Sequence, residues 1–317
     1  MSFKSSPLNG FQRMMLRWED FHPVNASHVV ELGGRHDASR IGELVRRIPR
    51  ALGLLPISFD PGRHSLRRHD DDGGEPRFRV LTGPAAGRSG LEGVIREELG
   101  QPFGPDPSWP LRCFLLSEGD RQSFGVVYPH AISDSRGISL IVREILRALG
   151  NLPPLVRGLD FHPPHIKTMF PAELGWRGFV RRSATSLREL AKFTASFPPP
   201  RRSRETTMEP GVPDVSLAVA TLKENARRIG GTVHTLIGAA LTEALALNFA
   251  DELARTRRKA ISLYTPVDLR REAGVPLERA VGQILGSQVT RAAVPEGASF
   301  AKLAGEIARQ TQRQRER

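Results

Sequence analysis

One short stretch, residues 123–137, constrains the fold of this chain more than any other, because it joins a strand pattern to a helix pattern within a few residues. The run from Phe124 to Tyr128 is continuously apolar, which predicts a buried β-strand. From Gly137 onward the apolar residues recur at helical spacing, which predicts a helix with one buried face. His130 and Asp134 lie on the connection between the two. A tight strand-to-helix connection on a rigid scaffold can present such side chains to a ligand.

The imidazole of His130 is suited to general-base chemistry, because histidine ordinarily titrates close to neutral pH. Asp134 follows four residues later and could orient the ring directly, or fix the loop by pairing with a cation elsewhere in the chain. For so short a motif the alternative is structural: a histidine at a strand end and an aspartate that caps a helix.

Other segments add context to this motif. The proline-rich run of residues 101–112 comes before it, Pro266-Val-Asp-Leu-Arg270 follows far downstream, and Val281-Gly-Gln-Ile-Leu285 comes last. In this order the chain resembles the condensation-domain superfamily of thioester-dependent acyltransferases. This superfamily includes peptide-synthetase condensation domains, wax ester/diacylglycerol synthases and polyketide-associated acyltransferases. We therefore identify the chain as a candidate member.

The shared motif of that superfamily is H-H-x-x-x-D-G or H-x-x-x-D-G, and this chain departs from it at two points. Pro129 stands in place of the first histidine, and Ser135-Arg136 separate Asp134 from Gly137, so the motif glycine is displaced.

The resemblance implies an α/β fold with two chloramphenicol-acetyltransferase-like sandwich lobes. It implies that His130 is the general base, and that Asp134 is structural and pairs with Arg270 near the displaced Gly137. It also implies an acyl donor carried as a thioester on coenzyme A or a carrier protein, and an alcohol or amine acceptor. We expect no bound cofactor and no metal.

We expect three parts: 1–150 as an N-terminal lobe with the motif, 151–215 as a crossover, and 216–317 as a partial C-terminal lobe. Members of the superfamily continue beyond the Val281–Leu285 pattern with further strands and helices. The second lobe is therefore expected to be incomplete, with an unpaired strand edge that a complementing polypeptide could cover. A non-catalytic remnant and a peptide-synthetase-type condensation domain are the alternative functions.

The crossover contains Lys167–Arg204, a basic stretch with interleaved apolar and aromatic residues. We expect it to pack its apolar face on the body of the protein. The alternative is docking at an anionic membrane interface, which basic amphipathic helices can do.

Composition excludes several classes of function. The net charge of +12 comes from scattered arginines without a helix-turn-helix or zinc spacing, so we do not expect a nucleic-acid partner. His64, His69 and residues 70–72 fall in a charged, glycine-containing loop that is typical of a solvated hairpin tip rather than a metal site. A single cysteine, Cys113, excludes an intrachain disulfide, and no apolar signal core is seen at the N-terminus, so we expect a cytoplasmic protein.

The remaining patterns predict further strands and helices. The expected strands are Val24–Leu32, Leu54–Phe59, Arg77–Thr82, Cys113–Leu116, Ser216–Ala220, Ile261–Val267 and Val281–Val289. The expected helices are Asp37–Leu52 with Asp37 as its cap, Leu91–Leu99, Leu222–Ile229, a buried helix capped by Thr232, and Phe300–Arg317. Trp18 is expected to anchor a short lead-in, Arg13–Phe21.

Overall fold

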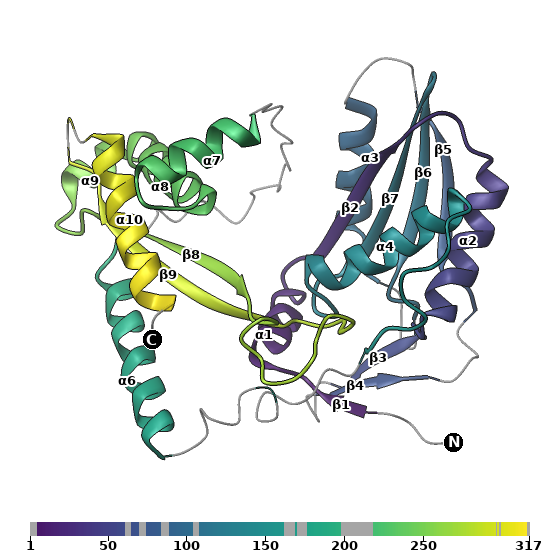
Figure 1. The fold of residues 1–317 in the computed structure, drawn as a ribbon, viewed down its shortest axis with the longest axis horizontal. Helices are drawn as coiled ribbons and strands as arrows, with labels where there is room; N and C mark the ends of the chain where they lie inside the picture. Colours follow the sequence, from purple (N-terminus) through teal and green to yellow (C-terminus); the bar gives the residue numbers. More distant parts are fainter. Residues whose placement is uncertain are drawn as a thin grey trace. The chain divides into compact units, whose positions relative to one another are not determined.

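The computed structural model describes residues 5–60, 65–69, 74–83, 89–103, 108–161, 169, 176–197, 218–295, 297 and 299–315. These residues divide into two compact units, and each is described by itself (Figure 1). Unit 1 comprises the described residues of 5–169 and of Leu269–Leu285. Unit 2 comprises the described residues of 176–268 and of 286–315. Residues 269–285 therefore belong with the N-terminal unit, whereas the sequence-based division assigned them to the C-terminal part.

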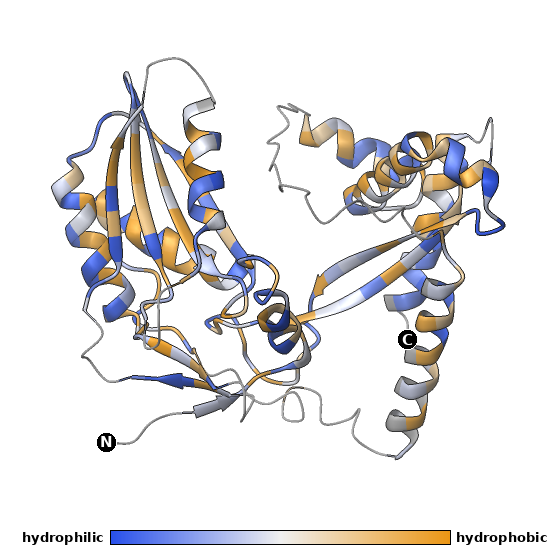
Figure 2. Cartoon of the chain, turned by 180° about the vertical axis from the view of Figure 1, so that it is seen from behind, coloured by the Kyte–Doolittle hydropathy of each residue, from blue (hydrophilic) through white to orange (hydrophobic). Residues whose placement is uncertain are grey.

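Unit 1 is built on a four-stranded sheet in the order β2 (Asn25–Leu32), β7 (Arg121–Pro129), β6 (Arg112–Glu118) and β5 (Arg77–Thr82). The first three strands pair antiparallel, and β5 pairs with β6 in parallel. The central strands are apolar along most of their length (Figure 2).

Both faces of this sheet are covered. Phe124, Val126 and Tyr128 of β7 belong to the main core together with apolar residues of α2 (Ala38–Ala51) and α4 (Ser135–Leu149). Val127 points to the opposite face and packs with apolar residues of α3 (Ser89–Gly100). Successive side chains of a strand alternate between faces, so a strand covered on both sides needs a continuous apolar run.

A second, three-stranded antiparallel sheet in unit 1 has the order β1 (Ser5–Pro7), β4 (Ser65–Arg68) and β3 (Ile57–Asp60). Helix α1 (Gly10–Trp18) follows β1 and begins with a reciprocal capping box between Asn9 and Gln12.

Unit 2 contains α6 (Trp176–Thr194), α7 (Val219–Arg228), α8 (Val233–Asn248), α9 (Ala250–Arg255) and α10 (Phe300–Arg315), with a two-stranded sheet of β8 (Ala260–Asp268) and β9 (Leu285–Ala293). Its core lies where α7, α8 and α10 meet. Thr232 caps α8 through a reciprocal capping box, as predicted. No described helix is by itself long and apolar enough to cross a bilayer, although α7 and α8 pass that test together as a pair bent by 86°.

Helix α10 supplies hydrogen bonds along one edge of β9. Gln310 accepts from Arg291 N at 2.9 Å and donates to Arg291 O at 2.6 Å. Gln314 accepts from Val289 N at 3.3 Å and donates to Val289 O at 2.6 Å. Two amide side chains one helical turn apart therefore bond the edge as a neighbouring strand would. The edge of β9 is therefore hydrogen-bonded at Val289 and Arg291, whereas an unpaired strand edge was expected in this part of the chain.

Most predicted elements are present, and the exceptions have physical causes. Strand β9 begins at Leu285 rather than Val281, because Ile284 N donates to the carboxylate of Asp134 instead of entering a ladder. The predicted strand Ser216–Ala220 is wrong where it is described: α7 begins at Val219. Short apolar runs do not distinguish a strand from a helix, and strong helix formers follow this one.

The expectation that the basic segment packs its apolar face on the body is not met for the described residues of α6. Four of its apolar side chains are exposed: Trp176, Val180, Leu187 and Leu190. Trp18, expected as an anchor, is about half exposed. His64, residues 70–72 and residues 198–204 lie outside the described residues.

Candidate functional site

The connection that carries His130 begins where β7 ends. Pro129 is the last strand residue, and the main-chain N of His130 donates to Val24 O at 2.8 Å. A tight turn follows, in which Ile132 N donates to Pro129 O at 3.0 Å. Asp134 then caps α4 by accepting from Gly137 N at 3.0 Å. Strand end, turn and cap together fix the main chain around the histidine.

The tautomer of His130 follows from its contacts. Its Nδ1 lies 3.1 Å from the carbonyl oxygen of Ser133, and a carbonyl can only accept, so Nδ1 carries the hydrogen. Nε2 therefore holds a lone pair and can take a proton. The ring of Tyr128 meets the imidazole edge-on at 6.2 Å between centroids. Burial, and then the charge of Asp134, raises the pKa of Tyr128, so its phenol stays protonated at neutral pH.

The carboxylate of Asp134 is only 3 % exposed and is held by four hydrogen bonds. Oδ2 accepts from Arg270 Nη1 at 2.8 Å and from Ile284 N at 3.2 Å. Oδ1 accepts from Arg270 Nη2 and from Gly137 N, each at 3.0 Å. The predicted contact between Asp134 and Arg270 is confirmed. With its lone pairs occupied in this way, the carboxylate fixes the loop and does not orient the imidazole.

Gly137, the displaced motif glycine, lies in the first turn of α4, close to Val281. A Cβ added there would collide with Ser133 Oγ and would lie 3.2 Å from the Cα of Val281. A larger residue would force Ser133 or the main chain at Val281 to shift, so the glycine has a steric role two positions later than in the motif.

Two further residues, Gln283 and Gln12, contact the histidine loop and a third, Asn9, holds Gln283; sequence reasoning did not select them. Gln283 donates through Nε2 to the carbonyl of His130, and Gln12 donates to Ala131 O at 2.9 Å. Asn9 donates to Gln283 O at 2.7 Å. The pattern N-x-x-Q at Asn9 and Gln12 signals a helix start, but it contains no information about which distant carbonyl the glutamine reaches.

A cavity of about 1130 Å³ lies in unit 1 next to Pro129, the residue before His130. Its apolar lining includes Leu16 and Trp18 of α1, Phe59 of β3, and Phe103. The polar side chains at this cavity include Arg13, Arg17 and Glu19. Burial, and then the charge of Asp20, raises the pKa of Glu19. The volume is comparable with the roughly 300–1,000 Å³ of typical small-molecule sites.

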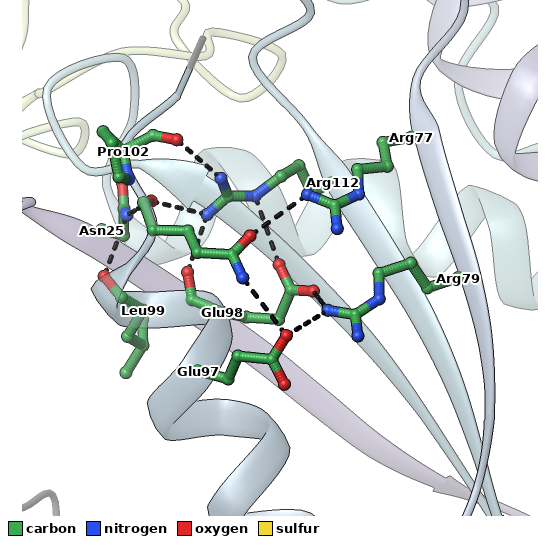
Figure 3. Close-up of polar contacts among 9 residues, drawn as sticks. Asn25, Arg77, Arg79, Glu97, Glu98, Leu99, Pro102 and Arg112 are labelled. Carbon is green, nitrogen blue, oxygen red and sulfur yellow. Dashed lines mark hydrogen bonds and ion pairs between the residues drawn. The ribbon is translucent and has the colours of Figure 1, made fainter.

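An ion-pair network joins α3 to the strands β5 and β6 (Figure 3). Arg112 donates to the carbonyls of Glu98, Gln101 and Pro102 at 2.7–2.9 Å and lies over the ring of Phe103 at 4.1 Å. The carboxylate of Glu98 is paired with Arg112 at 3.3 Å and with Arg79 at 2.7 Å. The network binds the carboxyl end of α3 to the start of β6, so we assign it a structural role.

The described residues contain no group of three or more His, Cys, Asp or Glu side chains placed to hold a metal ion. His69, part of the charged loop, has its Nε2 at 2.7 Å from Ser58 Oγ.

No protein-family model and no curated protein matches the sequence, whereas many solved structures match the fold. The first condensation domain of the calcium-dependent antibiotic synthetase, solved with a substrate analogue, gives a TM-score of 0.71 at 16% identity, over 98% of this chain and 74% of that chain. The condensation domain of the monacolin K polyketide synthase MokA gives 0.59 at 15% identity, over 99% and 73%. The X-domain in its complex with OxyB, from teicoplanin biosynthesis, gives 0.60 at 15% identity, over 99% and 70%. The chain has the condensation-domain fold, which confirms the predicted α/β fold class.

Proposed function

We propose that this chain, which has the condensation-domain fold, transfers an acyl group from a thioester to a hydroxyl or amine acceptor, with His130 as general base. The observation that carries the proposal is the state of His130. Its Nδ1 hydrogen is directed at Ser133 O, so the lone pair is on Nε2, while the neighbouring carboxylate is occupied by Arg270.

The chemistry needs no covalent enzyme intermediate. His130 Nε2 takes the proton from the acceptor as its oxygen or nitrogen attacks the thioester carbonyl carbon. The tetrahedral adduct collapses, the carbon–sulfur bond breaks, and the imidazolium returns its proton to the departing thiolate. The products are an ester or amide and a free thiol, and the protein is unchanged.

The donor in this proposal is an acyl thioester of coenzyme A or of a carrier protein. The cavity beside Pro129 supports a substrate with a substantial apolar portion, because aromatic and aliphatic side chains make up much of its lining.

The test is to incubate the purified protein with acyl-CoA thioesters and a mixture of alcohols and amines, and to measure free thiol and acylated acceptor. His130→Ala should lower turnover by about 10²–10⁴-fold, the usual contribution of a positioned general base. His22→Ala is the matched control, because His22 is exposed and its Nδ1 contacts only the neighbouring Pro23 O among its described hydrogen bonds. Turnover of His130→Ala equal to that of the control would remove His130 from the mechanism.

The second candidate function is binding of a protein partner without catalysis. One similar fold, the X-domain, was solved in complex with OxyB, which favours this candidate. If the purified wild-type protein is folded but releases thiol from none of the donors, that result would support partner binding over acyl transfer.

A further inference from the structure

Two glutamine side chains hold consecutive main-chain carbonyls at the proposed base. Gln283 donates to the carbonyl of His130, and Gln12 donates to that of Ala131. Both side chains are buried, Gln283 at 4 % and Gln12 at 9 % exposure. They come from opposite ends of unit 1 in the sequence and meet at the turn that presents the imidazole.

The orientation of the Gln283 amide follows from the ring beside it. Its Nε2 lies 3.3 Å from His130 Nδ1, which cannot accept because it carries the hydrogen directed at Ser133 O. The amide hydrogen therefore goes to the His130 carbonyl. The reverse orientation would place the amide oxygen against that carbonyl oxygen, two acceptors with no hydrogen between them.

The other end of the Gln283 side chain is unsatisfied. Its Oε1 is buried and has no hydrogen-bond partner among the described residues. An unsatisfied buried acceptor reduces stability by about 1–3 kcal/mol. Because its Oε1 lowers stability, the presence of a glutamine at position 283 is better explained by the hydrogen bond of its nitrogen to the histidine turn.

Gln12 is itself held rigidly. Its Oε1 accepts from Asn9 N, and its main-chain N donates to Asn9 Oδ1, each at 3.0 Å. The Asn9 side-chain nitrogen donates to Gln283 O at 2.7 Å. The two glutamines are therefore linked through Asn9, and side chains fixed in this way can hold a third group in one geometry.

We infer that Gln283 and Gln12 are positioning residues that fix His130 with Nε2 directed to its substrates, an inference that rests on the proposed function. Asp134 cannot orient the ring because Arg270 occupies its carboxylate. The glutamines do so through the main chain and leave a neutral amide, not a carboxylate, beside Nδ1. A displacement of about 1 Å in a reacting group can lower the rate by about 10²-fold.

The kinetic test compares Gln283→Leu with Gln288→Leu in unit 2. Gln288 is also buried and donates to a main-chain carbonyl, Thr311 O, at 2.9 Å, so the control makes the same chemical change away from the site. Gln283→Leu should lower kcat by about 10–100-fold with little change in KM. Gln288→Leu should leave kcat unchanged. Equal kcat values for the two variants would overturn the inference, and Gln12→Leu repeats the test if Gln283→Leu does not fold.

The second arm uses Gln283→Glu. A carboxylate beside Nδ1 favours the protonated ring, so the acid limb of the pH–rate profile should move to higher pH. The other ionisable groups facing the ring are Tyr128, which is neutral, and Asp134, which is paired with Arg270. An unmoved limb would contradict contact between residue 283 and the imidazole ring.

A third measurement needs no substrate. In protein carrying ¹⁵N-labelled histidine, His130→Ala identifies the His130 ring signals. Gln283→Leu should shift those signals, and Gln288→Leu should not. If the wild-type protein has no transferase activity but Gln283→Leu still shifts the His130 ring signals, the contact between Gln283 and the ring is supported and the proposed function is rejected. Unshifted signals would reject the positioning role.

Discussion

The guanidinium of Arg270 forms a two-point ion pair with the carboxylate of Asp134 across 136 residues of sequence, and both side chains are almost completely buried. The same carboxylate caps α4 and accepts from Ile284 N. One side chain therefore joins the histidine turn, the first turn of α4 and residues 269–285.

Removing either member of this pair should destabilise unit 1 strongly. Asp134→Asn or Arg270→Met leaves an uncompensated or unsatisfied buried group, and we expect a loss of about 3–5 kcal/mol in the free energy of unfolding. The double variant should lose less than the sum of the single losses, because neither charge then remains alone. Urea unfolding of the four proteins measures this coupling, and strictly additive losses would contradict a direct pair.

His28 should make stability depend on pH. Burial lowers the pKa of His28 below its ordinary value of 6.5, so just below that pH the unfolded chain binds a proton that the folded chain does not. Stability from this residue is therefore lost as the pH falls through 6.5 and is regained as it rises. We expect the free energy of unfolding of His28→Gln to fall less than that of the wild type between a pH above 6.5 and a pH below it. Urea titrations at the two pH values measure this difference. Parallel pH profiles would show that His28 does not contribute.

The exposed apolar side chains of α6 should contribute little to folding. Leu187 and Leu190 are exposed, so Leu187→Ser with Leu190→Ser should change the free energy of unfolding by no more than about 0.5 kcal/mol. Leu236→Ala in the core of unit 2 is the control and should lose about 2–5 kcal/mol. A loss of that size in the double variant would mean that α6 packs its apolar face after all. Co-sedimentation of the wild type with anionic vesicles, lost in the same variant, would identify a membrane as the partner of this face.

The glutamines of α10 should protect the edge of β9. Gln310→Ala with Gln314→Ala leaves Val289 and Arg291 with unpaired main-chain groups on that edge, and such edges promote association between chains. We expect a lower unfolding temperature and a concentration-dependent increase in light scattering. Gln312→Ala, on the same helix, is an exposed control. A double variant that stays monodisperse would show that the edge is protected in another way.

Sequence alone determined the local elements and one long-range contact of this protein. Apolar runs and helical spacing predict β7 and α4, because burial on one or both faces dictates where apolar residues recur. The capping residues Asp37 and Thr232 mark helix starts, because their side chains bond main-chain groups a few residues away. The contact between Asp134 and Arg270 was predicted only from the resemblance in the order of motifs. Hydrophobic periodicity carries no information about which distant residues meet, whereas proteins that share the order of motifs also share the contacts between them.

Tertiary structure decided what surrounds His130. Gln283 lies in a segment whose apolar pattern predicts a strand, yet its neighbour Ile284 bonds the carboxylate of Asp134 and its own amide bonds the histidine turn. In the sequence, Asn9 and Gln12 have the pattern of a helix start. Only the tertiary structure brings Gln12 to the carbonyl of Ala131 and Asn9 to that of Gln283. Local patterns encode hydrogen bonds between near neighbours, whereas these bonds join residues that only the packing of unit 1 brings together.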